Sequence, residues 1–311
     1  MKKVLIALVL ILCLAGVAVA QDSSHVHFSR VYDPNRTAPA ASANITYYGG
    51  PIIHGGVNVY VIYYGSWTTS QQSIINTWLQ HLGNSPLWNI NTTYYDTATP
   101  ANFVSTAVNF NATTNTYIDL YSLGKTLTDA QTQSIITNAI NGGHLPNDTQ
   151  GVYFVLTYLD VNQNALGGSF CSLYCGYHGP STSIIAGETL KYSFVGDPAK
   201  CPTGCDGNVA VLGDSTTPNN SIDADGAISI IFHELSESVT DPEVNLHTAW
   251  QAGTCGENGD CCNFTFGPTR KVANGSHANE SIGGKAYLIQ EMFELTGTGT
   301  SKVPGICKQK K

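Results

Sequence analysis

The sequence has 311 residues, of which 42% are hydrophobic and only 12% are charged, and its formal net charge is −8 at pH 7. An acidic chain with no basic patch lacks the electrostatic attraction that nucleic-acid binding needs, so we expect no nucleic-acid partner. Most of the polarity comes from Ser, Thr, Asn, Gly and Tyr, a composition that suits an extracellular matrix better than the cytosol.

The N-terminus has the three parts of a secretory signal peptide. Lys2 and Lys3 precede an apolar run over residues 4–19, and small residues occupy Ala18 and Ala20. We therefore expect a signal peptide over residues 1–20, cleaved after Ala20. No later stretch approaches the ~20 apolar residues of a membrane span, so no membrane association is expected after cleavage. Residues 21–47 lack periodicity and predict a disordered leader, and residues 48–311 predict a single globular domain.

The domain alternates predicted strands and helices. β-Branched and aromatic runs indicate strands, and amphipathic stretches after Ser or Thr indicate helices, with Thr69 or Ser70 as the first N-cap and Thr128 as the second. This order is typical of an α/β fold with a mixed, largely parallel sheet and flanking helices. The predicted strands are 57–64, 116–121, 151–159, 183–186, 191–195 and 285–291, and the predicted helices are 71–82, 129–140 and 226–240.

Eight cysteines remain once Cys13 is removed with the signal peptide, and all of them follow residue 170. An even number of cysteines in a secreted chain indicates up to four disulfides, although the sequence leaves the connectivity open. We expect all eight to be oxidised, with the pairs Cys171/Cys175 and Cys201/Cys205 close in the fold, and a disulfide-rich C-terminal part. The other four are Cys255, Cys261, Cys262 and Cys307.

Nine N-x-S/T sequons predict a glycoprotein, because glycans attach at exposed sequons of secreted chains. Each sequon alone is a weak signal in a chain rich in Asn, Ser and Thr, but their spread along the chain favours glycosylation. The sequons begin at Asn35, Asn44, Asn91, Asn111, Asn147, Asn219, Asn263, Asn274 and Asn279.

The predicted helix 226–240 carries His233, Glu234 and Glu237 in an otherwise apolar run. Residues at i and i+4 project from one face of a helix, so His233 and Glu237 have the spacing of the two metal-binding histidines in H-E-x-x-H sites. A carboxylate also binds Zn²⁺ or another divalent metal, and Glu234 then occupies the position of a general base that activates metal-bound water.

A third ligand has to come from elsewhere in the chain. Glu257 and Asp260 are the nearest candidates, on a loop bounded by cysteines, and His247, Asp241 and His178 are further options. A sheet that precedes such a helix is typical of zincin-type proteases, so a zincin-like, metal-dependent hydrolase is one expectation. The alternative is that the three helix residues form a solvated face or a hydrogen-bond network and bind no metal.

Several segments together resemble one family. They include Tyr-Gly-Gly-Pro at 48–51, Phe-Cys-x3-Cys-Gly-Tyr-His at 170–178, Lys-Cys-Pro-x2-Cys at 200–205 and His-Glu-Leu-Ser-Glu-Ser-Val-Thr-Asp-Pro at 233–242, in collinear order over about residues 48–307. These segments resemble the EXORDIUM, or phosphate-induced protein, family. The resemblance implies a secreted protein of the apoplast or cell wall that takes part in growth or environmental response, with cell-wall or matrix components as partners. It brings no settled enzymatic activity.

Overall fold

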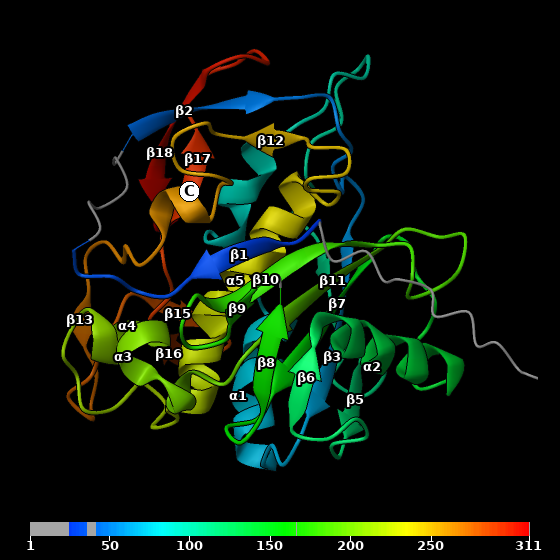
Figure 1. The fold of residues 1–311 in the computed structure, drawn as a ribbon. Helices are drawn as coiled ribbons and strands as arrows, with labels where there is room; N and C mark the ends of the chain where they lie inside the picture. The colour runs from blue at the N-terminus through cyan, green and yellow to red at the C-terminus, as the bar shows by residue number, and fades with distance from the viewer. Residues whose placement is uncertain (1–24, 36–41, 166, 311) are drawn as a thin grey trace, which may run out of the picture.

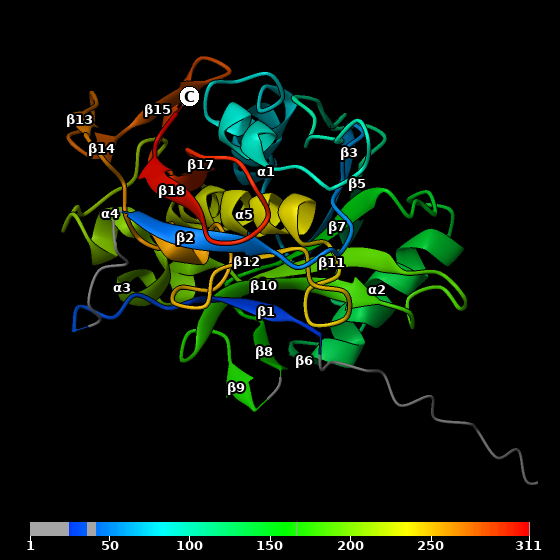
Figure 2. The ribbon, with the colours of Figure 1, turned by 90° about the horizontal axis from the view of Figure 1, so that it is seen from above.

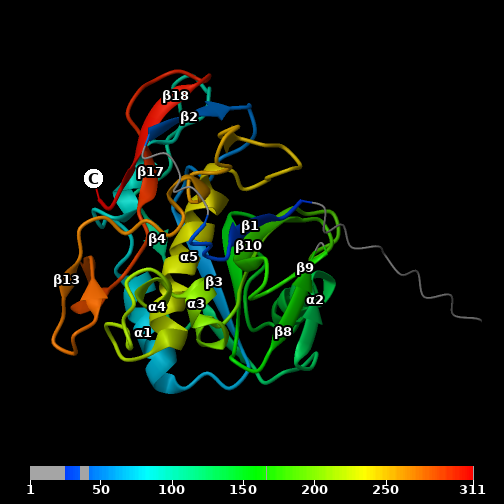
Figure 3. The same ribbon diagram turned by 60° about the vertical axis from the view of Figure 1, so that its left-hand side comes forward.

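The computed structural model describes residues 25–35, 42–165 and 167–310. The predicted signal peptide and its cleavage site lie outside these ranges. A central sheet carries helices on both faces: α1 and α5 pack on one face, and α2 lies on the other (Figure 3). This layering confirms the predicted mixed α/β class.

Seven of the described strands form the central sheet, in the order β1-β10-β11-β7-β3-β4, with β5 also paired to β3. The pairings among β11, β7, β3, β4 and β5 are parallel, whereas β10 runs antiparallel to β11 and β1 antiparallel to β10. The strands are β1 (His27–Arg30), β3 (Val57–Tyr64), β4 (Val108–Asn109), β5 (Thr116–Asp119), β7 (Gly151–Thr157), β10 (Tyr174–Ser181) and β11 (Leu190–Val195).

A second sheet, with the order β12-β2-β18-β17, lies at the end of the molecule toward which the C-terminus of α5 points (Figure 1). Shorter strands pair as β6-β8-β9, β13-β14 and β15-β16. These strands are β2 (Ser42–Tyr47), β6 (Thr126–Thr128), β8 (Asn162–Ala165), β9 (Gly168–Ser169), β12 (Trp250–Gln251), β13 (Arg270–Lys271), β14 (His277–Ala278), β15 (Glu280–Ile282), β16 (Lys285–Tyr287), β17 (Met292–Leu295) and β18 (Val303–Lys308).

The long helices follow from local sequence signals. Thr68 caps α1 and Thr128 caps α2, each in a capping box with a Gln three residues later. The predicted α1 caps, Thr69 and Ser70, are therefore wrong: Thr68 is the residue with extended backbone angles whose hydroxyl accepts from the N–H of Gln71. The helices are α1 (Thr69–Gln80), α2 (Asp129–Asn141), α3 (Pro202–Cys205), α4 (Gly207–Ala210) and α5 (Ile222–Thr240), with 3-10 turns η1 (Trp88–Thr93), η2 (Pro198–Lys200) and η3 (Asp260–Cys262).

Two predicted regions differ from the structure. The described parts of the predicted disordered leader 21–47 include β1 and β2, whose backbone hydrogen bonds go to the distant strands β10 and β18. Residues 183–186, predicted as a strand, form turns, and β11 instead pairs with β10, a strand that the sequence analysis missed. The partners of β1 and β2 are remote in sequence, so no local pattern predicts the pairing, and the Gly- and Pro-containing sequence of β10 gives no strand signal.

Four disulfides join the eight cysteines that follow residue 170. The pairs expected to lie close were Cys171/Cys175 and Cys201/Cys205, and the disulfides join one pair to the other, as Cys171–Cys201 and Cys175–Cys205, with Cα–Cα distances of 5.7 and 5.5 Å. These bonds fasten the start of β10 to α3. The remaining disulfides are Cys255–Cys261 and Cys262–Cys307.

The structure corrects three of the nine predicted glycosylation sites. The side chains of Asn91, Asn263 and Asn279 are at most 7% exposed, and each donates hydrogen bonds inside the fold. A glycan on any of them would displace core contacts. Five sequon asparagines are exposed, and Asn219 is half-buried; the exposed five are Asn35, Asn44, Asn111, Asn147 and Asn274.

Candidate metal centre

Helix α5 brings the predicted motif into the interior of the protein. Ser221 caps its N-terminus, and the helix then runs between α1 and the strands β10 and β11 of the central sheet (Figure 2). His233, Glu234 and Glu237 are each 0% exposed. The expected solvated helix face is therefore wrong, because both faces of this helix are covered. His233 Nε2 lies 3.0 Å from Glu237 Oε1, as the i, i+4 spacing predicts.

The proton of His233 is positioned by Gln290, which follows β16. The amide nitrogen of Gln290 donates to the carbonyl oxygen of Gly259, so its Oε1 is left to accept the Nδ1–H of His233 at 3.1 Å. In the neutral imidazole, Nε2 then carries the lone pair. That nitrogen faces two carboxylates, Glu237 Oε1 and, at 3.7 Å, Asp260 Oδ1. A lone pair that faces carboxylate oxygens requires a positive charge, as either a proton or a metal ion.

His178, on β10, reaches the same cluster from the central sheet. Its Nδ1 lies 3.2 Å from Glu234 Oε2 and 3.4 Å from Glu237 Oε2, and its Nε2 lies 3.7 Å from Glu257 Oε1. The side chain is 1% exposed. Both ring nitrogens of His178 thus face carboxylates, so this histidine also requires either a second proton or a metal ion.

The cysteine-bounded loop supplies the remaining carboxylates, as predicted. The backbone N–H of Asp260 donates to Glu237 Oε1 at 3.1 Å, which ties the loop to α5. Glu257 is 0% exposed, and neither of its carboxylate oxygens has a hydrogen-bond partner among the described residues. An ionised carboxylate without partners is costly in a protein interior, so the position calls for a cation or a proton.

The N-terminal strand β1 closes the cluster from outside. His27 contacts Asp260 through Nε2, and its Nδ1 lies 3.5 Å from Glu257 Oε2. His27, which belongs to the segment predicted as a disordered leader, therefore lies in an ordered strand instead. Because β1 pairs with the edge of β10, it places His27 beside His178, with the ring centroids 6.4 Å apart (Figure 1).

A glycine allows the loop to approach the helix this closely. A Cβ on Gly259 would lie 2.8 Å from Glu237 Oε1 and 2.9 Å from the ring of His233. Any larger residue would separate the loop from α5, and the Asp260 N–H would lose its contact with Glu237.

The pKa values show how strongly the cluster attracts positive charge. Burial lowers the pKa of His233, but Glu237 and the neighbouring carboxylates outweigh burial and raise it to about 10. Burial likewise opposes charge on His178, yet Glu234 and Glu237 raise its pKa to about 9. Burial would raise the pKa of Glu237, but the two histidines lower it well below its usual range. For Glu257 burial dominates and raises the pKa.

Five side chains form two candidate ligand sets, whose ligand atoms lie within 4.8 Å of one another in each set. The sets share Glu237, and both are buried. The first set is His233, Glu237 and Asp260, and the second is His178, Glu234 and Glu237.

The predicted residues thus meet only in part as expected. His233 and Glu237 face one cluster with Glu234 adjacent, and Asp260 rather than Glu257 completes the first set. His178 was one of several options, whereas His247 lies at the surface, with its side chain 67% exposed and paired with Glu243. Sequence reasoning missed Gln290, which no motif marks.

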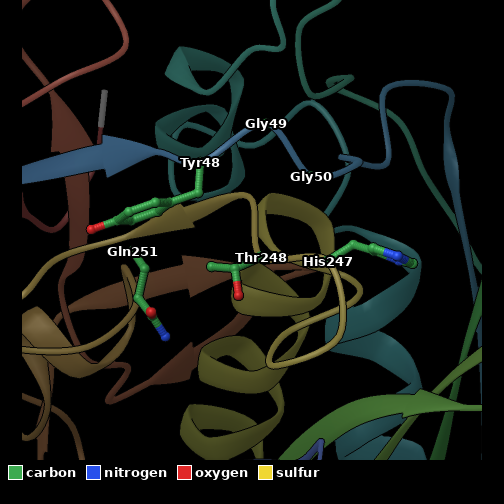
Figure 4. A pocket seen from close by; sticks show the side chains of 6 residues that line it. All are labelled: Tyr48, Gly49, Gly50, His247, Thr248 and Gln251. Atoms are coloured by element: carbon green, nitrogen blue, oxygen red, sulfur yellow. The ribbon is translucent and has the colours of Figure 1, made fainter.

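Among the described residues, the five side chains of the two ligand sets are each at most 4% exposed. A surface hollow of about 530 Å³ lies beyond the end of α5 and is lined by residues including Tyr48, Gly50 and His247, but by none of the clustered ligands (Figure 4). A hydrolase needs an open coordination position that substrate can reach. The zincin-like arrangement is therefore not confirmed. No helix among the described residues combines the length and apolar character required to cross a membrane.

Comparison with known proteins identifies the family of the chain. The sequence model of the phosphate-induced protein 1 conserved region matches residues 45–298. Protein EXORDIUM-like 3 of Arabidopsis thaliana is 32% identical over 297 residues, covering 85% of each chain. Protein EXORDIUM-like 5 of the same plant is 31% identical, covering 83% of this chain and 73% of the relative.

Protein PHOSPHATE-INDUCED 1 of Nicotiana tabacum is 24% identical, covering 80% of this chain and 85% of the relative. No solved structure matches the chain. The family model and the relatives each span most of the domain that carries the α5 cluster, and they agree with the resemblance seen in the sequence motifs. The chain therefore belongs to the EXORDIUM, or phosphate-induced protein, family.

Proposed function

We propose that this EXORDIUM-family protein is a secreted, non-catalytic metalloprotein whose α5 cluster holds a divalent metal ion in its core. The observation that carries the proposal is the environment of His233 Nε2. Gln290 holds the ring proton on Nδ1, and Nε2 faces only Glu237 and Asp260. A ligand set of one imidazole and two carboxylates fits Zn²⁺ or Mn²⁺.

Burial favours a metal with a stabilising role over a catalytic one. Asp260 is 4% exposed and the other two residues of the set are 0% exposed, so the three ligands offer a substrate almost no accessible surface. The ion would instead join α5 to the cysteine-bounded loop, and it would compensate the negative charge of carboxylates that are buried away from water. Glu234, predicted as a general base, is likewise 0% exposed.

Secretion and extracellular action form the second part of the proposal. Four disulfides and five exposed sequon asparagines fit an oxidising, glycosylating compartment, and the predicted signal peptide supplies the route. From family membership we propose a role in growth or environmental response in the apoplast or cell wall, with cell-wall or matrix components as partners.

The metal is tested by elemental analysis of the secreted protein after dialysis into metal-free buffer. We expect at least one Zn²⁺ or Mn²⁺ ion per chain, and we expect a chelator to remove it and lower Tm. If the ion is present at about 100 times its Kd, it stabilises the fold by about 2.7 kcal/mol, or roughly 5–10 °C in Tm.

His233→Ala should abolish binding to the first ligand set. The matched control is His247→Ala, which removes an exposed histidine and should leave the metal content unchanged. If the wild-type protein carries no metal, and added Zn²⁺ or Mn²⁺ does not raise its Tm, the proposal is wrong, and the two histidines serve as buried imidazolium partners of the carboxylates.

A further inference from the structure

We propose that the α5 cluster binds two divalent cations, bridged by the carboxylate of Glu237, with His178 and Glu234 as the ligands of the second ion. This inference rests on the proposed function and deepens it. The first ion lies between His233, Glu237 and Asp260, and the second ion lies between His178, Glu234 and Glu237.

The two oxygens of Glu237 divide the cluster into two halves. Oε1 lies beside His233 Nε2, at 3.0 Å, and Oε2 lies beside His178 Nδ1, at 3.4 Å. Oε2 has no hydrogen-bond partner among the described residues. A carboxylate that offers one oxygen to each of two cations is the usual bridge of sites whose ions lie about 3.5–4 Å apart.

Glu234 supports a second ion through its own unsatisfied oxygen. Its Oε1 has no hydrogen-bond partner in the described part of the chain, and its Oε2 faces His178 Nδ1 at 3.2 Å. A fully buried carboxylate in this position is costly as an isolated charge. When the carboxylate of Glu234 binds a metal ion, the ion compensates its charge and its lone pairs coordinate the ion.

The surroundings of His178 leave its Nδ1 available to a metal. Its Nε2 faces Glu257 Oε1 at 3.7 Å, while the other oxygen of Glu257 faces His27. A histidine that binds metal through one nitrogen and directs the other N–H at a carboxylate has the common second-layer arrangement of metal sites. Glu257 therefore orients His178, and β1 holds Glu257 in place through His27.

The charge of the cluster agrees with two ions. Glu234, Glu237, Glu257 and Asp260 contribute four negative charges when ionised, and they are at most 5% exposed. With neutral histidines, one divalent ion leaves two of these four charges uncompensated, and two divalent ions balance all four. Asp241, which is 0% exposed and interacts electrostatically with Glu257, is a fifth buried carboxylate, whose charge needs a proton or a further cation. A buried charge without a counter-charge is strongly unfavourable. A second ion therefore removes the desolvation penalty of the carboxylates that a single ion leaves uncompensated.

Metal stoichiometry tests the inference on the full-length protein. The protein is stripped with a chelator and titrated with Zn²⁺, and bound metal is measured by elemental analysis after gel filtration. We expect two ions per chain for the wild type and for His247→Ala, and one for His178→Ala. Glu234→Gln should also bind only one ion. If Glu234 were instead a general base that does not bind metal, this variant would keep both ions.

A second measurement does not depend on whether the variants fold. The wild-type protein loaded with Mn²⁺ should give the electron paramagnetic resonance spectrum of a spin-coupled pair, because the two ions share a carboxylate. One ion per chain with the hyperfine pattern of an isolated Mn²⁺ would overturn the inference and leave the proposed function standing. No bound ion at all would overturn both, and two ions in folded His178→Ala would overturn the assigned ligands.

Discussion

Replacing Gln290 tests whether metal affinity depends on the orientation of His233 and not only on the stability of the fold. Gln290→Leu keeps the volume of the side chain but removes the acceptor of His233 Nδ1–H and the donor to the Gly259 carbonyl. His233 is then free to adopt the other tautomer, with a proton on the nitrogen that faces the metal. Loss of such a second-layer partner lowers metal affinity by about 10- to 100-fold, which corresponds to about 1.4–2.7 kcal/mol.

The same change destabilises the metal-free protein, because two buried polar groups lose their partners at about 1–3 kcal/mol each. Gln133→Leu is the matched control. Gln133 is also 0% exposed, and it hydrogen-bonds to Asp129 and Ser181 on the opposite face of the central sheet from α5 (Figure 3). Both variants should lower the free energy of unfolding, but only Gln290→Leu should lower metal affinity.

The assay combines urea unfolding of the metal-free proteins with Zn²⁺ titration against a competing chelator. Gln290→Glu restores an acceptor for His233 Nδ1–H and should recover most of the lost affinity. The reasoning is refuted if Gln290→Leu binds Zn²⁺ within about twofold of the wild type, or if Gln133→Leu loses as much affinity as Gln290→Leu.

Two further predictions concern the rest of the molecule. Peptide mapping of the folded protein from a eukaryotic secretory host should find glycans at exposed sequons such as Asn44 and Asn111 but none at the buried Asn91; substantial occupancy of Asn91 would contradict the fold. Burial, with Asp225 nearby, raises the pKa of Asp206 from 3.8 to about 7. Its stabilising contribution is therefore complete below pH 4 and is lost as pH rises through 7. Asp206→Asn keeps an acceptor for the N–H of Val209 but cannot ionise. Between pH 4 and pH 7, its free energy of unfolding should therefore fall less than that of the wild type, by up to about 4 kcal/mol. The same pH slope in urea unfolding of both proteins would exclude the raised pKa of Asp206.

The sequence by itself determined the features that depend on neighbouring residues. The i, i+4 geometry of a helix makes His233 and Glu237 neighbours wherever α5 lies, and this spacing allows the observed distance of 3.0 Å. The strand β3 matches its predicted bounds because a β-branched, aromatic run specifies a buried strand without reference to its partners. Thr128 was found as a cap for the same local reason.

Tertiary structure decided which remote groups complete the cluster. His178 lies on β10, a strand whose Gly- and Pro-containing sequence gives no strand signal, and its place depends on pairing with β11. His27 reaches the cluster because β1 adds to the sheet edge, and Gln290 because its loop packs on α5.

The pairing of cysteines and the burial of three sequons were likewise settled only in three dimensions. Spacing along the chain leaves both questions open, because the hydrogen bonds and contacts concerned join segments that are distant in sequence. Their partners are fixed by tertiary packing, and the free energy of that packing is distributed over the whole core rather than encoded in any local motif.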